Sequence, residues 1–171
     1  MWRRTGNENN TTEATTRKGN DQVTVALNRL LAGELTAMDQ YFIHSRMYRD
    51  WRFDTLYQHV HHEMEEETGH ADALIRRLLF LEATPDLTQR SGLTIGQDVP
   101  SMLKNDLALE YAVIANLREA IAVGELNGDF QSREMLETLL DDTEEDHTYW
   151  LEQQLRLIDT VGLQNYLQSQ M

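Results

Sequence analysis

Two stretches of the sequence carry the motif Glu-x-x-His inside an apolar helical stripe. The motifs are Glu67 with His70 and Glu144 with His147. Leucines recur at three- and four-residue steps on both sides of each motif, so the glutamate and the histidine fall on the buried face of a helix. Because a lone buried carboxylate is strongly unfavourable unless it is neutralised or paired, the chain has to fold so that these charges meet partners.

The arrangement is repeated along the chain. Glu34 lies 33 residues before Glu67, and Glu110 lies 34 residues before Glu144; each also interrupts an apolar stripe. Of the six histidines, only the two in the motifs follow a glutamate by three residues. The repeat predicts two helical hairpins, each with a single glutamate on one helix and Glu-x-x-His on its partner.

The periodicity predicts an all-α fold. Long helices are expected at about residues 21–49, 54–82, 101–126 and 131–160, and a short fifth helix after Gly162. Residues 84–100, which hold both prolines of the chain, read as a long loop, and Ser101 is the expected N-cap of the third helix. A short turn, a long crossover and a second short turn are typical of a four-helix bundle with one crossing connection.

Composition restricts the function classes. The chain has 171 residues, a formal net charge of −14 and no cysteine. The charge argues against nucleic-acid or anionic-membrane binding, and the missing cysteines exclude disulfides and thiolate metal sites. No apolar run is long enough to span a membrane, and the polar first twenty residues do not resemble a secretory signal. We expect a cytoplasmic protein with a disordered tail at 1–20 and one domain at 21–171.

Facing helices would bring four carboxylates and two imidazoles together. Two divalent ions would balance these charges, and oxygen-rich ligation with one imidazole per ion suits iron or manganese. The pattern is that of di-iron carboxylate bundles. We expect one ion on Glu34 and His70, the other on Glu110 and His147, with Glu67 and Glu144 bridging. Such a centre oxidises Fe(II) to Fe(III) with dioxygen or hydrogen peroxide.

Tyr41 is a further candidate for the reaction. It lies seven residues after Glu34, two turns along the same helical face. Its hydroxyl could donate a hydrogen bond to a ligand, or its ring could supply an electron. An ordinary core tyrosine is an equal alternative.

Several segments of the sequence resemble the bacterioferritin family of ferritins. They are GELTAMDQYFIHSRMYRDW (33–51), EETGHAD (66–72), LREAI (117–121), TEEDHTYWLEQQL (143–155) and GLQNYLQSQM (162–171). The resemblance implies a ferritin-like four-helix bundle with a short C-terminal fifth helix, a shell of 24 subunits around an iron-mineral cavity, and a ferroxidase centre in each subunit. The family's metal ligands match Glu34, Glu67, His70, Glu110, Glu144 and His147.

The same resemblance has implications outside the centre. His62, Glu63 and Glu66 match polar positions of the family's channels and inner surface, although acids there could simply be solvated. In haem-binding members a methionine follows the bridging glutamate of the second helix; here Thr68 takes that place, and a hydroxyl is a poor haem-iron ligand. The resemblance is therefore to the haem-free branch, and haem is expected to be absent.

Alternatives remain at this point. The chain could be a non-haem subunit that co-assembles with a haem-binding bacterioferritin subunit, or a di-iron peroxide-detoxifying relative without storage. A DNA-protecting mini-ferritin is disfavoured because one chain carries all six ligands and only the tail is basic. A purely structural bundle does not explain four glutamates and two histidines placed symmetrically on core stripes.

Overall fold

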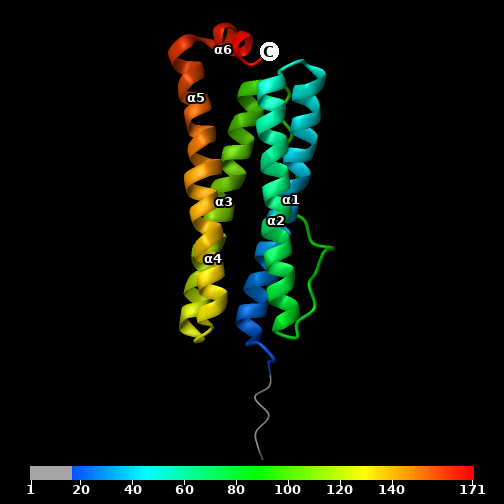
Figure 1. Ribbon diagram of the computed structural model, residues 1–171, viewed down its shortest axis with the longest axis vertical. Helices are drawn as coiled ribbons and strands as arrows, with labels where there is room; N and C mark the ends of the chain where they lie inside the picture. Colours follow the sequence, from blue (N-terminus) through cyan, green and yellow to red (C-terminus); the bar gives the residue numbers. More distant parts are fainter. Residues whose placement is uncertain (1–16) are drawn as a thin grey trace, which may run out of the picture.

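The structure, a computed structural model, describes residues 17–171, and in this range the chain forms only helices, turns and loops (Figure 1). The helices are α1 (Asp21–Asp50), α2 (Asp54–Phe80), α3 (Val99–Leu126), α4 (Phe130–Asp142), the π-helical segment η1 (Thr143–Thr148), α5 (Tyr149–Val161) and α6 (Leu163–Ser169). Because α4, η1 and α5 follow one another without a break, they form a single long fourth helix. The predicted four-helix bundle with a short fifth helix is confirmed. The predicted tail falls mostly on residues 1–16, outside the described range.

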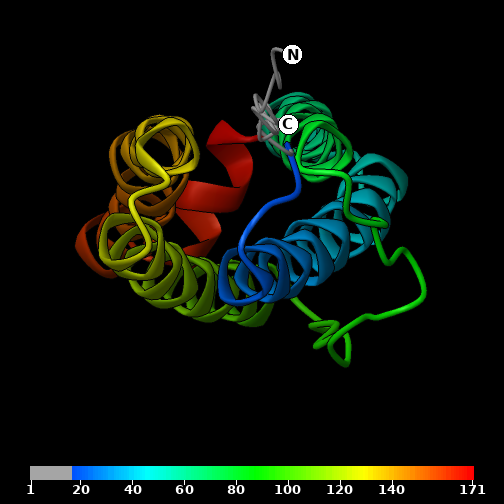
Figure 2. The ribbon, with the colours of Figure 1, turned by 90° about the horizontal axis from the view of Figure 1, so that it is seen from below.

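The bundle consists of two antiparallel hairpins, α1 with α2 and α3 with α4–η1–α5 (Figures 1 and 2). The crossover between α2 and α3 runs along the outside of α1, as the end-on view shows (Figure 2). Helix α6 closes one end of the bundle (Figure 1), where Tyr166 is fully buried and the Thr55 N–H donates to the Gln170 carbonyl at 3.0 Å.

Side chains of α1 hold the crossover in place. Three polar residues four positions apart, Thr36, Gln40 and His44, line one side of this helix. Each accepts a hydrogen bond from a backbone N–H of the loop: those of Ser91 (2.9 Å), Thr94 (3.0 Å) and Gly96 (3.4 Å), respectively. Spacing of four residues aligns side chains along a helix, so α1 offers the extended loop a row of acceptors.

Asp106 of α3 binds two members of this row. It accepts hydrogen bonds from Gln40 Nε2 at 2.8 Å and from His44 Nδ1 at 2.9 Å, and all three side chains are buried. Since His44 Nε2 accepts from Gly96, its Nδ1 must carry the proton donated to Asp106. The network joins α1, α3 and the crossover.

The start of α3 differs from the prediction. Asp98, not Ser101, is the N-cap: its side chain accepts from the Ser101 N–H at 2.8 Å, and Ser101 Oγ accepts from the Asp98 N–H at 3.2 Å. This is a capping box. Pro100, assigned to the loop by the sequence, lies in the first turn, where no backbone N–H is needed. The predicted N-cap was therefore wrong by three residues.

The hydrophobic core is divided into two clusters. One contains Leu27, Leu31, Leu74, Leu78, Leu117 and Leu136, and the other contains Tyr48, Leu56, Leu103, Leu151 and Tyr166. Buried charged residues lie in the same helices, in sequence between the members of the two clusters. Among the described helices, none is long and apolar enough to cross a membrane.

Two glycines of the crossover differ in the space around them, and this difference tests the path of the loop. A Cβ on Gly96 would lie 2.5 Å from the backbone nitrogen of Met102 and 2.8 Å from its Cα, whereas a Cβ on Gly92 would meet nothing within 4 Å. We expect Gly96→Ala to destabilise the protein by about 1–3 kcal/mol, as overpacking does, and Gly92→Ala to have little effect. Urea unfolding of both variants checks this; equal midpoints would contradict the assigned loop path.

Candidate metal centre

A layer of buried ionisable side chains crosses the bundle. Its members are Glu34 of α1, Glu67 and His70 of α2, Glu110 of α3 and His147 of η1. None is more than 7% exposed. All five were predicted on inward faces, and their burial confirms this part of the sequence analysis.

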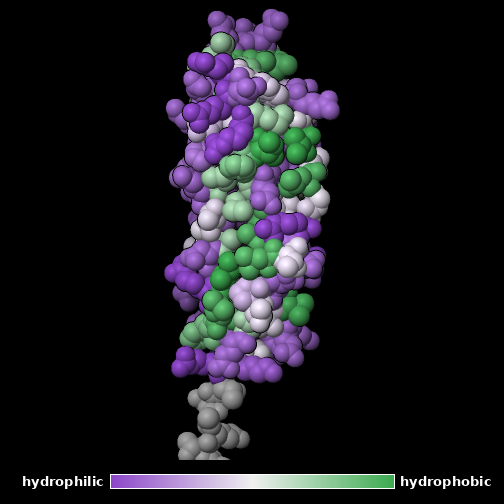
Figure 3. Space-filling view, turned by 90° about the vertical axis from the view of Figure 1, so that its right-hand side faces the viewer, coloured by the Kyte–Doolittle hydropathy of each residue, from purple (hydrophilic) through white to green (hydrophobic). Residues whose placement is uncertain are grey.

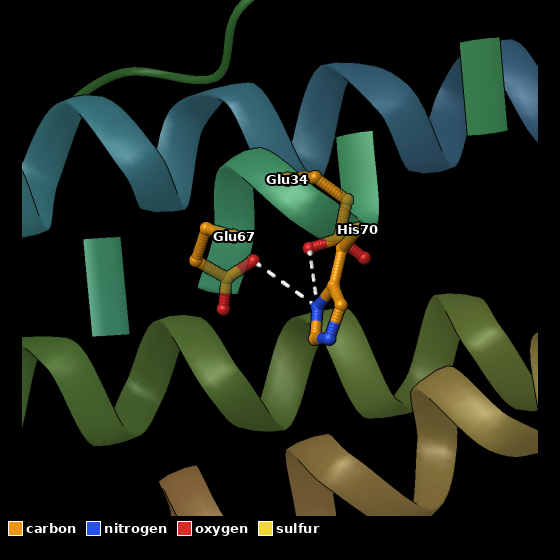
Figure 4. Close-up of side chains that lie close together, drawn as sticks. All are labelled: Glu34, Glu67 and His70. Atoms are coloured by element: carbon orange, nitrogen blue, oxygen red, sulfur yellow. Dashed lines mark ion pairs between the residues drawn. The ribbon is translucent and has the colours of Figure 1, made fainter. Parts of the chain in front are cut away.

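Half of the layer lies between α1 and α2 (Figure 4). His70 Nδ1 is 3.8 Å from Glu34 Oε2 and 3.6 Å from Glu67 Oε2, and both carboxylates point towards the imidazole (Figure 4). These three residues offer ligand atoms that all lie within 4.8 Å of one another. Glu67 and His70 share a face because they are separated by three residues of regular α-helix.

The other half lies between α2, α3 and η1. His147 Nδ1 is 2.9 Å from Glu67 Oε1 and 3.8 Å from Glu110 Oε1, and these residues form a second group with ligand atoms within 4.8 Å. The rings of His70 and His147 are stacked, with centroids 5.7 Å apart. Glu67 belongs to both groups, with one oxygen towards each histidine.

Burial and mutual attraction shift the pKa values in the layer. Burial raises the pKa of Glu34 well above its usual range and that of Glu110 to about 6. For Glu67, burial is opposed by the interactions of its carboxylate with Glu34 and both histidines, which together hold its pKa below the usual range. The histidines respond in the opposite sense. Burial opposes their charge, but the carboxylates outweigh it and raise the pKa of His70 to about 10 and that of His147 to about 12.

Many polar atoms of the layer lack hydrogen-bond partners. They are both oxygens of Glu34, Oε2 of Glu67, Oε2 of Glu110, Nδ1 of His70 and Nδ1 of His147. Buried polar atoms are rarely left unpaired in folded proteins. All six are carboxylate oxygens or imidazole nitrogens, donor types that bind Fe(II) and Mn(II). The donor set therefore fits two divalent ions, which Glu67 could bridge.

Tyr41 lies beside this layer. It is 1% exposed, and its hydroxyl donates a hydrogen bond to Glu110 Oε1. Burial, followed by the charge of Glu110, raises the pKa of Tyr41 well above 10. The phenol is thus protonated at neutral pH and orients one carboxylate of the layer. Its role as an electron donor stays a prediction.

Glu144 is the one predicted ligand that the structure does not bring to the layer. Its side chain is 36% exposed, and Oε1 accepts from Arg118 Nη2 at 2.5 Å. The prediction assumed a regular α-helix, in which residues three apart share a face. Both Glu144 and His147 lie in the π-helical η1, whose wider turn separates them. Its assignment as a ligand stays a prediction.

A pocket of about 330 Å³ lies next to His147. It is lined by His59, His62, Glu63, Glu66, Glu145, Asp146, Tyr149, Trp150 and Gln153. His147 Nε2 is 3.0 Å from Glu63 Oε2 and 3.3 Å from Glu66 Oε2, and these three residues form a third group that could hold a cation. His62, which the resemblance also pointed to, is more exposed and lies 3.5 Å from Glu66.

Sequence reasoning missed two residues of this region. His59 stacks on Trp150, with ring centroids 3.7 Å apart, and its Nε2 is 3.1 Å from Glu63 Oε1. The four-residue step from His59 to Glu63 was the available signal. Asp142 Oδ2 also approaches His70 Nε2, at 3.7 Å.

Thr68 lies on an exposed side of α2. Its hydroxyl donates to the Met64 carbonyl at 2.9 Å, one turn earlier in the same helix. The side chain thus hydrogen-bonds its own backbone.

The chain is similar to known proteins along most of its length. Residues 24–161 match the model of the ferritin-like domain. The chain is 60% identical to the bacterial ferritin of Synechocystis sp. and 58% identical to that of Pseudomonas aeruginosa, covering 90% of this chain and 99% of each relative. It is 39% identical to the bacterioferritin of Brucella melitensis, over 87% of this chain and 92% of that relative. These proteins match the chain along nearly its whole length, and the chain folds into the same kind of helical bundle that the ferritin-like domain names. The chain therefore belongs to the ferritin family.

Proposed function

We propose that the chain is an iron-storage subunit with ferroxidase activity. Two Fe(II) ions bind between the helices as substrate, are oxidised to Fe(III) and move on to a mineral store. The observation that carries this proposal is the pair of buried ligand groups that share Glu67. Membership of the ferritin family supports iron as the metal.

The residues of the layer have distinct tasks in this scheme. Glu34 and His70 hold one ion, Glu110 and His147 hold the other, and Glu67 bridges them, with Glu144 as a second bridge. Dioxygen or hydrogen peroxide accepts the electrons. Tyr41 keeps Glu110 in place through its hydrogen bond and is an additional electron source.

The pocket beside His147 is suited to cation transfer. It carries four acidic side chains, Glu63, Glu66, Glu145 and Asp146, of which Glu63 and Glu66 lie within 3.3 Å of His147. Clustered negative charge raises the local concentration of cations. We assign this pocket to the exchange of iron between the layer and the space outside the bundle.

Assembly into a 24-subunit cytoplasmic shell is part of the proposal. The face that carries the crossover shows apolar side chains among polar ones (Figure 3). Phe42 and the loop residues Leu87, Leu93 and Ile95 are between 45% and 52% exposed. Exposed apolar patches are typical of protein–protein contacts, and a shell of identical chains would cover them.

The alternative is a mixed shell. Thr68 at the position of the family's haem ligand favours a chain that binds no haem itself, which could assemble alone or with a haem-binding partner. A di-iron peroxide-detoxifying relative without storage is the remaining alternative.

Substitutions in the layer test the ferroxidase site. We expect Glu67→Gln and His147→Ala to slow Fe(II) oxidation by about 100-fold or more, because each removes a ligand, while the assembled particle persists. Stopped-flow absorbance of Fe(III) formation and native mass determination are the measurements. Glu119→Gln, at an exposed ion pair with Arg29, is the matched control. Unchanged oxidation in the ligand variants would refute the assignment.

The pKa values predict exchange of protons for metal. His70 and His147, with pKa values of about 10 and about 12, carry protons at pH 7, and an imidazolium cannot bind an ion through its protonated nitrogen. Binding of two Co(II) ions should therefore release at least two protons. Affinity should rise with pH, by about tenfold per unit for each proton displaced.

Calorimetry in two buffers of different ionisation enthalpy counts these protons. His147→Gln should release one proton fewer than the unaltered chain. Co(II) affinity that is the same at pH 6 and pH 8 would show that the imidazoles are not ligands.

Haem content tests the reading of Thr68. The protein produced alone should show no Soret band, because a hydroxyl does not replace a thioether as an iron ligand. Thr68→Met restores the ligand type and is the matched comparison. A stoichiometric Soret band in the unaltered protein would overturn this interpretation.

A further inference from the structure

The carboxylate of Glu144 has a definite partner outside the metal-ligand layer. Arg118 of α3, eight residues beyond Glu110, donates from Nη2 to Glu144 Oε1 at 2.5 Å. Arg118 is 65% exposed, and among the described residues no second ion pair of its guanidinium is found within 4 Å. The contact links α3 to η1 at the edge of the centre.

The backbone of η1 determines where this carboxylate lies. In a regular α-helix, 3.6 residues per turn would place Glu144 only about 60° from His147 around the helix axis. In η1 the turn is wider, so His147 stays 1% exposed while Glu144 points to Arg118. The contact of Glu144 with Arg118 therefore depends on the wider turn of η1.

We propose that Arg118 is a positioning residue that competes with the bound ion for the carboxylate of Glu144. This inference rests on the proposed function, in which Glu144 is a ligand on the His147 side. When the carboxylate lies on Arg118, that ion has lost one ligand and is held more weakly. Arg118 therefore favours release of the ion from the His147 side, next to the acidic pocket.

The size of the effect follows from exposure. Ion pairs between exposed side chains are weak, so Arg118 shifts the affinity of one ion by about two- to fivefold and does not block binding. Such a weak contact suits a centre through which iron passes, because the free energies of the ion-bound and ion-free states then differ little.

Co(II) binding tests the proposal independently of iron oxidation. The full-length assembled protein is titrated with Co(II) and followed by calorimetry and by the absorption of bound Co(II). Arg118→Ala should bind the weaker of the two Co(II) ions about two- to fivefold more tightly, with the stoichiometry unchanged. Arg118→Lys should stay near the unaltered protein, because the positive charge is retained.

The control variant is Arg29→Ala, which breaks the neighbouring exposed pair with Glu119 (3.0 Å) and should leave both Co(II) affinities unchanged. A double-mutant comparison distinguishes this role of Arg118 from a general loss of stability. In a Glu144→Gln background, Arg118→Ala should have no further effect, because Arg118 acts through that carboxylate.

The outcomes separate the two proposals. If the unaltered protein binds two Co(II) ions per chain and Arg118→Ala binds them with equal or lower affinity, the role of Arg118 is refuted and the metal centre stands. An effect that persists in the Glu144→Gln background also refutes it. If the unaltered protein binds no pair of Co(II) ions, both proposals fail.

Discussion

The structure depends on the burial of one carboxylate, Glu67, between two imidazoles. A buried charge is tolerated only when its partners are close and well placed, and here one oxygen faces His70 while the other faces His147. All four long helices must keep their register for this to hold, since the histidines come from α2 and η1 and the flanking carboxylates from α1 and α3. The two leucine- and tyrosine-rich clusters bury apolar surface, and the favourable free energy of that burial offsets the cost of burying the charged layer.

Helix α1 connects the charged layer to the crossover. It carries Glu34 and Tyr41 towards the layer, and Thr36, Gln40 and His44 towards the loop and Asp106. One rigid helix thus fixes both, so the long connection that makes the topology possible also stabilises the element that carries the ligands. The hydrogen bond from Tyr41 to Glu110 extends this support to α3.

His147 has carboxylates on both sides of its ring. Its Nδ1 faces Glu67 and Glu110 inside the bundle, and its Nε2 faces Glu63 and Glu66 at the pocket. A single imidazole therefore separates a buried, charge-balanced group from an acidic and more open one. A cation moving between the two would exchange one set of carboxylates for another without entering apolar surroundings. The contact between Glu144 and Arg118 lies between η1 and α3.

The sequence by itself determined the elements and their buried faces. The 3.6-residue periodicity placed Glu34, Glu67, His70, Glu110 and His147 inward, because the same period aligns them with the leucines that form the core. The sequence also predicts an N-cap at the start of α3, but the residue it predicts, Ser101, is the third residue of a capping box whose N-cap is Asp98. Tertiary structure alone decided what depends on contacts between distant segments. The stack of His59 on Trp150 and the acceptors that α1 offers to the crossover are of this kind. So is the π-helical turn at Glu144, since the periodicity of its sequence fits an α-helix equally well.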